Sequence, residues 1–205
     1  MQMKAVSAVE EESEPRRGPR YQHIIASSIE VFSRTNYEKA TTAMLAKEAG
    51  VAEGTLYNYF PTKKDLFLEC FRYISQVLVD RYVKIYKNTR HDPREYLLGV
   101  SRSYFEFVQE NPEMRRFLAF VLNNSFDSDF RAELDSFTMF NVNAAEQMIR
   151  KAIEQGEVRP DINPRVAAWI FVGGYFTLFL MSELEAEEFK DPDFLTDLMR
   201  LFLIQ

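Results

Sequence analysis

The sequence predicts an all-α protein of about nine helices, and three features of the chain lead to this prediction. Apolar residues recur at spacings of three and four along most of its length, which is the period of a helix face. No stretch alternates cleanly between apolar and polar residues, and no Asn-Gly or Asp-Gly pair joins two β-branched runs. With 205 residues and 46% hydrophobic content, the chain is long enough to bury a sizeable core.

Proline marks the start of several helices. Pro follows a helix-capping side chain in four pairs: Asp92-Pro93, Asn111-Pro112, Asn163-Pro164 and Asp191-Pro192. These marks and the periodicity predict helices at about 20–35, 42–49, 53–59, 63–88, 93–110, 112–123, 128–155, 164–187 and 192–204. Residues 1–19 are polar, charged and interrupted by Pro and Gly, so we expect a flexible tail there.

Charge is unevenly divided along the chain. The net charge is −6, but residues 16–65 carry eight Lys or Arg and five Asp or Glu, a net charge of +3. Residues 66–205 carry 16 basic and 22 acidic side chains, a net charge of −6. A basic segment ahead of an acidic body is compatible with a nucleic-acid partner, because binding needs a local cationic face and not a basic protein.

Several function classes are not indicated. The single cysteine, Cys70, excludes an internal disulfide framework, and its inward position favours a buried structural thiol over a redox sensor. The longest uncharged run, 166–182, has 17 residues, while a bilayer crossing needs about 20, and no secretory signal opens the chain, so a cytoplasmic protein is expected. Neither histidine has metal-ligand spacing, and no catalytic triad, phosphate loop or dinucleotide fingerprint is present, so we expect no metal, no cofactor and no enzyme.

Residues 42–59 have the spacing of two short helices joined by a tight turn. The positions expected to face inward are Leu45, Ala49, Val51, Leu56 and Tyr59. Gly50 stands where the turn needs a positive φ, and the apolar face of helix 20–35 supplies the supporting helix. The pattern predicts a helix-turn-helix domain at 20–66, followed by a second domain at 67–205.

The second of these short helices presents polar side chains. Thr55, Tyr57 and Asn58 lie on it, and two lysines follow directly. Hydroxyl, amide and ammonium groups bind phosphate oxygens, and a short helix fits the major groove of DNA. Lysine is unfavourable at a helix N-terminus, so Lys63 indicates an external anion, whereas a solvated helix start is the simpler interpretation of Lys64.

These residues carry a resemblance to a known family. The stretch "IIASSIEVFSRTNYEKATTAMLAKEAGVAEGTLYNYFPTKKDLF", residues 24–67, resembles the DNA-binding domain of the TetR family of bacterial transcriptional regulators. The resemblance implies phosphate-contact or positioning roles for Thr42, Thr55, Tyr57, Tyr59 and Lys63. It implies base reading by Glu53, Gly54, Thr55 and Asn58.

The chain departs from the family pattern at a few positions. Asn36 stands where the family usually has Gly, and Ala52 replaces a Ser, so the third helix lacks a side-chain cap. Ala43 and Glu53 occupy places where several members have a basic or polar side chain. Phosphate would repel Glu53 unless its carboxylate accepts from a cytosine amine, and we therefore expect Glu53 to decide sequence specificity.

The second domain is expected to dimerise. The run 166–181 is apolar all round and needs cover on every side, from its own core and from a partner. Helices 164–187 and 192–204 suit a four-helix interface with a second copy, and the resemblance implies the same homodimer. Two-fold symmetry then predicts a pseudo-palindromic operator in double-stranded DNA.

The second domain is also rich in aromatic residues, and the resemblance implies a ligand cavity among its middle helices. The candidates for binding a small apolar or aromatic effector are Tyr104, Phe105, Phe120, Phe137, Asn141, Trp169 and Tyr175. For each of them plain core packing is the alternative. The whole pattern predicts a ligand-responsive DNA-binding regulator, a repressor released from its operator by the effector. A DNA-binding protein with a structural or division-control role and no effector is the second hypothesis.

Overall fold

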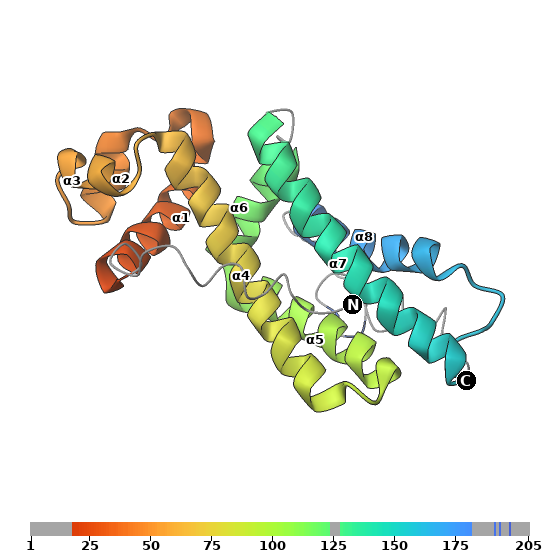
Figure 1. Cartoon of the computed structure of the whole chain (residues 1–205). Helices are drawn as coiled ribbons and strands as arrows, with labels where there is room; N and C mark the ends of the chain where they lie inside the picture. The colour runs from red at the N-terminus through yellow and green to blue at the C-terminus, as the bar shows by residue number, and fades with distance from the viewer. Residues whose placement is uncertain (1–17, 124–127, 182–190, 192, 194–196, 198–205) are drawn as a thin grey trace. The chain divides into compact units, whose positions relative to one another are not determined.

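The computed structural model describes residues 18–123, 128–181, 191, 193 and 197, and its elements are helices (Figure 1). The predicted all-α fold is confirmed. The described helices are α1 (Pro19–Lys39), α2 (Thr42–Glu48), α3 (Glu53–Tyr59), α4 (Lys63–Thr89), α5 (Pro93–Glu110), α6 (Pro112–Asn123), α7 (Ser128–Glu154) and α8 (Pro164–Met181). The helix expected at 192–204, the end of the one expected at 164–187 and most of the expected tail lie outside the described residues.

The predicted caps are present at two helix starts and differ at a third. The Asp92 carboxylate accepts from the Glu95 N–H group at 2.8 Å, and Asn163 Oδ1 accepts from the N–H group of Val166 at 3.2 Å. Asn111 instead donates its side-chain amide to the carbonyl oxygen of Phe107 at 3.0 Å. The same carbonyl oxygen also accepts from the Asn111 backbone N–H group at 3.1 Å, so the side chain adds a second donor at the end of α5.

The chain divides into two compact units, Met1–Cys70 and Phe71–Gln205. The division falls within α4, whose residues 63–70 belong to the first unit and 71–89 to the second. The sequence predicts the domain boundary at residue 66, one turn earlier in the same helix.

The first unit is a small cluster of helices around one core. In it α1 packs on α2 and α2 packs on α3 (Figure 1). Its core consists of residues that are 2% exposed or less, among them Ile24, Ile25, Ile29, Leu45, Leu56 and Phe67. Cys70 is buried as predicted, with its sulfur 3.8 Å from the carbonyl oxygen of Ile25, and burial raises the pKa of its thiol.

The backbone of α1 breaks near the end of the helix. Asn36 has φ 63° and ψ 172°, so the helix stops at Thr35, where the pattern predicted its end, and resumes for one turn. The positive φ agrees with the family resemblance, in which Gly usually stands at this position. Its ψ is extended, however, which places Asn36 outside the left-handed helical region and in one that is almost restricted to Gly.

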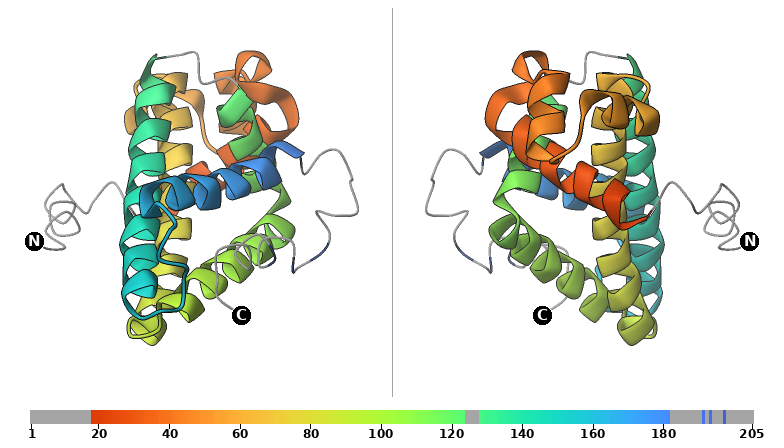
Figure 2. Two further views of the ribbon diagram at one scale, coloured as in Figure 1. Left: turned by 90° about the vertical axis from the view of Figure 1, so that its right-hand side faces the viewer. Right: turned by 90° about the vertical axis from the view of Figure 1, so that its left-hand side faces the viewer.

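The second unit is built from α5 to α8 and the later part of α4. Here α8 crosses α7 and packs closely on it, and α8 also packs on α6 (Figure 2). Fully buried side chains at the centre include Leu97, Phe107, Phe117, Val142 and Ala168. Among the described residues, no helix combines the length and apolar character that a membrane crossing requires.

Candidate functional site

The turn between α2 and α3 has the geometry of a helix-turn-helix motif. Gly50 has φ 61°, the positive value that the turn was expected to need. The Val51 N–H group donates to the carbonyl oxygen of Ala46 at 2.9 Å, which closes the turn. Leu45, Ala49 and Leu56 are buried as predicted, while Val51 and Tyr59 are half-buried. Without a cap at Ala52, α3 is held in place by this packing.

The other side of α3 is polar and open. Glu53, Gly54 and Asn58 are exposed, and 45% of the Tyr57 surface is accessible. A Cβ atom added to Gly54 would meet nothing within 4 Å. The packing of the described chain therefore does not require glycine at position 54, whereas close approach of an external molecule would benefit from it.

A chain of hydrogen bonds connects α2 with α3 on this open side. Thr42 Oγ1 lies 2.9 Å from Glu53 Oε2, and the Tyr57 hydroxyl lies 3.4 Å from Thr42 Oγ1. An ionised carboxylate only accepts, so the Thr42 hydroxyl donates to Glu53 and the Tyr57 hydroxyl donates to Thr42. The family resemblance implied a DNA contact for each of these three side chains, and the sequence did not predict the bonds between them.

Lys63 has partners inside the first unit. Its ammonium group donates to the carbonyl oxygens of Tyr37 at 2.9 Å and Ala40 at 3.0 Å, and lies 4.4 Å from the centre of the Tyr37 ring. These carbonyl groups belong to the C-terminal end of α1, where the helix dipole favours a cation. The lysine at the start of α4 thus serves the end of another helix, a pairing that its sequence position did not reveal.

The remaining predicted DNA contacts differ in how firmly they are held. The Tyr59 ring packs near Tyr21 of α1, with ring centres 6.4 Å apart, so packing positions it. Thr55 is half-buried on α3, one turn before Tyr59. Both side chains lie at the edge of the open side.

The interior of the second unit contains a stack of tyrosines. The ring centres of Tyr104 and Tyr175 are 4.1 Å apart, and Tyr82 of α4 lies 6.4 Å from Tyr104 in a parallel arrangement. All three are at least 93% buried. Burial raises the pKa of each phenol well above its usual value, so all three remain neutral and can donate a proton to a neighbour.

Two buried hydroxyl groups on α4 lack partners among the described residues. They are those of Ser75 and Tyr82, which lie two turns apart on one face of the helix. The Tyr175 hydroxyl also makes no well-formed hydrogen bond. The nearby Ser101 hydroxyl donates its proton to the carbonyl oxygen of Leu97, and it lowers the pKa of Tyr175 by less than burial raises it. Buried polar groups are normally paired, so unpaired ones are unusual in a helical core.

The other candidate effector residues are not all gathered around this stack. Phe105 is buried, and Phe120 is half-buried. Phe137 meets Phe71 edge to face at 6.0 Å, and Asn141 donates its amide to the Phe137 carbonyl oxygen at 2.8 Å. The sequence analysis named Trp169 as a candidate for the effector cavity. In the structure its side chain is 45% exposed on α8 and does not lie in the interior.

Trp169 belongs instead to an exposed apolar face. We call it the α7–α8 face, and it consists of Met139, Phe140, Val166, Trp169 and Ile170, each at least 38% exposed. Gly173 continues the face one turn further along α8, where a Cβ atom would meet nothing within 4 Å.

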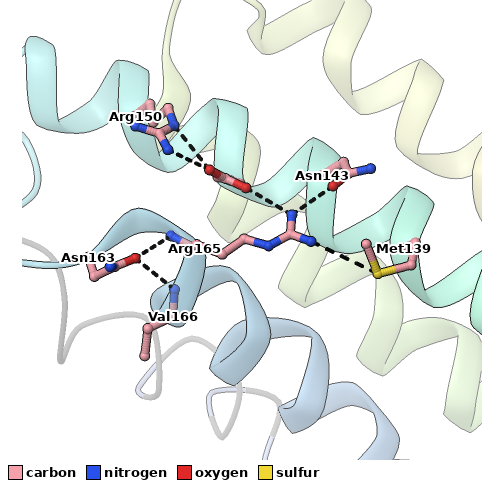
Figure 3. Close-up of polar contacts among 7 residues, drawn as sticks. Met139, Asn143, Arg150, Asn163, Arg165 and Val166 are labelled. Atoms are coloured by element: carbon pink, nitrogen blue, oxygen red, sulfur yellow. Dashed lines mark hydrogen bonds and ion pairs between the residues drawn. The ribbon is translucent and has the colours of Figure 1, made fainter.

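A polar network fixes one edge of the α7–α8 face (Figure 3). Arg165 of α8 donates to Asn143 at 2.7 Å and to Glu146 at 2.8 Å, both on α7, and its guanidinium lies 5.9 Å from the centre of the Trp169 ring. Hydrogen bonds from Arg150 and then from Arg165 lower the pKa of Glu146. The network holds α7 and α8 in one relative position, so the apolar residues beside it form a defined surface.

Comparison with known proteins bears on both units. Residues 24–70 match the family described as "Bacterial regulatory proteins, tetR family". The "Fatty acid metabolism regulator protein" of Bacillus subtilis (strain 168) is 23% identical over 158 residues, which cover 77% of this chain and 80% of that protein. "Nucleoid occlusion factor SlmA" of Marinobacter nauticus is 26% identical over 170 residues, 80% of this chain and 85% of that one.

Solved structures share the fold of this chain. The crystal structure of the transcriptional regulator FadR from Bacillus subtilis in complex with stearoyl-CoA superposes with a TM-score of 0.74. The identity is 18%, and the superposition covers 87% of this chain and 97% of that one. The helix-turn-helix segment within residues 24–70 therefore matches the tetR family of bacterial regulatory proteins, and the helical fold of the chain is shared with FadR.

Proposed function

We propose that this protein is a ligand-responsive repressor that binds a pseudo-palindromic operator as a homodimer. The DNA-contacting surface comprises Thr42, Glu53, Gly54, Thr55, Tyr57, Asn58, Tyr59 and Lys63. The polar open side of α3 supports this assignment, because donors presented on a short helix suit phosphate and base edges in the major groove. Lys63 offers phosphate only the part of its ammonium group that the carbonyl groups of α1 leave available.

The homodimer is proposed to form through the α7–α8 face and the segment 192–204. Exposed apolar residues from two helices gather on this face, and large contiguous apolar patches on a soluble protein mark interaction sites. The open Gly173 allows a partner helix to approach closely. Trp169→Glu is expected to give monomers in sedimentation velocity and to weaken operator binding. A dimer that persists in this variant would contradict the proposed interface.

Effector binding is proposed in the tyrosine stack of the second unit. The observation that carries this proposal is the pair of buried, unpaired hydroxyl groups at Ser75 and Tyr82. A ligand with an apolar or aromatic body and a hydrogen-bonding group would pair them while stacking on the rings. The FadR structure holds stearoyl-CoA, a long apolar chain on a polar head, which is compatible with such a ligand.

Helix α4 is the proposed link between effector and operator. It carries Ser75 and Tyr82, and Lys63 at its start donates to a carbonyl oxygen at the end of α1. A shift of α4 on effector binding would change the separation of the two recognition helices. Linkage requires operator DNA to weaken effector binding by the factor by which effector weakens operator binding, commonly about 5–150-fold. Titrating long-chain acyl-CoA and planar aromatic compounds with and without operator tests this; equal affinities would rule the mechanism out.

A second candidate is a DNA-binding protein with a division-control role and no effector. The similarity to nucleoid occlusion factor SlmA over 80% of this chain supports this second candidate. Mapping of bound chromosomal sites separates the two proposals. A few sites beside regulated genes would support a repressor, and many dispersed sites without induction by any ligand would support the second candidate.

A further inference from the structure

We propose that Glu53 selects a cytosine in each half of the operator and that Thr42 acts as the positioning residue for its carboxylate. The inference rests on the proposed DNA-binding function and assigns the base that the open side of α3 reads. It also changes the role of Thr42 from phosphate contact to support of Glu53.

The direction of the hydrogen bonds determines which groups stay available. The Thr42 hydroxyl has one proton, and this proton goes to Glu53 Oε2 at 2.9 Å. Thr42 therefore has no proton left for a phosphate oxygen while this bond is made. Its oxygen accepts instead from Tyr57 at 3.4 Å, a longer contact that the tyrosine can exchange for an external acceptor.

The bond to Thr42 leaves Glu53 Oε1 as an acceptor held in one place. Thr42 is the first residue of α2 and Glu53 the first residue of α3, so the bond ties the carboxylate to the adjoining helix. Glu53 is exposed, and no described residue hydrogen-bonds its Oε1 atom. A long side chain fixed in this way loses less rotamer freedom when it binds.

The chemistry of base edges identifies the target. In the major groove thymine presents an acceptor and guanine presents two, all of which repel a carboxylate. Adenine presents the N6 amine next to the N7 acceptor, so a carboxylate that reaches the amine also meets a repelling atom. Cytosine presents the N4 amine with no acceptor on its own edge, and the carboxylate can approach it from the C5 side, away from the O6 atom of the paired guanine. Cytosine is therefore the base that a fixed carboxylate prefers.

The negative charge of Glu53 strengthens the discrimination. An acid on a DNA-facing surface lowers affinity for phosphate on every sequence, since non-specific binding is electrostatic. A cytosine amine offsets this loss only at the correct site. A carboxylate in this position thus reduces non-specific binding while the preferred site keeps its affinity.

The test is selection of bound DNA from a random library by the full-length protein and by its variants. The wild type is expected to select one C·G pair in each half-site, with a preference of about tenfold at that position. Glu53→Gln presents an amide that suits adenine N6 and N7, so it is expected to lose the preference for cytosine, to keep the other selected positions and to bind unrelated DNA more tightly. Thr42→Val should lose the preference as well, and Thr42→Ser should restore it because the hydroxyl returns. The control is Glu30→Gln, an exposed acid on α1, which should keep the full wild-type motif.

A second measurement uses modified DNA, so the test does not depend on the folding of Thr42→Val. N4-methylcytosine at the selected position keeps its base pair but replaces the groove-side N–H by a methyl group. It should weaken the wild type about tenfold and leave Glu53→Gln unchanged. If the wild type selects a motif and Glu53→Gln selects the same motif in full, this inference alone is overturned. The Thr42–Glu53 bond is then a structural contact. A wild type that selects no motif at all would overturn the proposed function together with the inference.

Discussion

Replacing Asn36 by glycine is expected to stabilise the first unit. Asn36 has φ 63° and ψ 172°, a backbone region that only glycine adopts readily and that costs other residues about 1–3 kcal/mol. The side chain recovers part of this, because Asn36 Oδ1 accepts from the Lys39 N–H group at 3.2 Å. Losing that cap to glycine costs a few tenths of a kcal/mol, and glycine adds about 0.4–1 kcal/mol of entropy to the unfolded chain. With strain near the middle of its range, Asn36→Gly should raise the free energy of unfolding by about 1 kcal/mol.

Two further substitutions separate strain from capping. Asn36→Ala keeps the strained backbone and loses the acceptor, so we expect it to destabilise the first unit by about 1–2 kcal/mol. Asn36→Asp keeps an acceptor for Lys39 and should be close to neutral. The matched control is Asn88→Gly at an exposed helical position of α4, where glycine should destabilise by a few tenths of a kcal/mol.

The assay is urea unfolding of the full chain, followed by far-UV circular dichroism and by hydrogen exchange of the α1 amides. Trp169 is the single tryptophan and lies in the second unit, so its fluorescence gives an internal reference for that unit. A lower urea midpoint of α1 in Asn36→Gly at an unchanged m-value would contradict this prediction, because the backbone strain at Asn36 would then cost less free energy than the side-chain cap contributes.

Three other predictions concern buried or internally paired groups. Lys63→Met should lower the stability of the first unit by about 2 kcal/mol, since it removes charged hydrogen bonds to Tyr37 and Ala40, and urea unfolding measures this; an unchanged midpoint would mean that these bonds contribute nothing. Tyr82→Phe should raise the stability of the second unit by about 1 kcal/mol and weaken effector binding, because an unpaired buried hydroxyl is removed; calorimetry tests both effects, and a loss of stability would indicate a hidden partner. Burial, with a smaller contribution from Tyr86, raises the pKa of Tyr96 to about 12, so above about pH 10 the unfolded chain loses a proton that the folded one retains. Stability should therefore fall from about pH 10 towards 12, and an equally steep fall in Tyr96→Phe would contradict this origin.

Local patterns in the sequence determined the helices. The starts at Pro93 and Pro164 agree with those predicted, because a capping side chain, a proline and a 3.6-residue period act within a few residues of each other. The starts at Glu53, Lys63 and Pro112 agree as well, although residues 52 and 111 supply no side-chain cap there. The same holds for the turn at Gly50, where a positive φ depends on a single residue. The family was likewise readable from residues 24–67, since the motif is contiguous.

Tertiary structure decided what the polar side chains touch. Lys63 meets carbonyl groups 23 and 26 residues earlier in the chain, and Glu53 meets a hydroxyl 11 residues away, so no local pattern contains these pairs. The same limit explains Trp169, because an all-apolar helix does not reveal which of its faces the other helices cover. Residue type and spacing specify local backbone geometry, whereas partners of polar groups depend on how separate helices meet, and that is set by packing of the whole core.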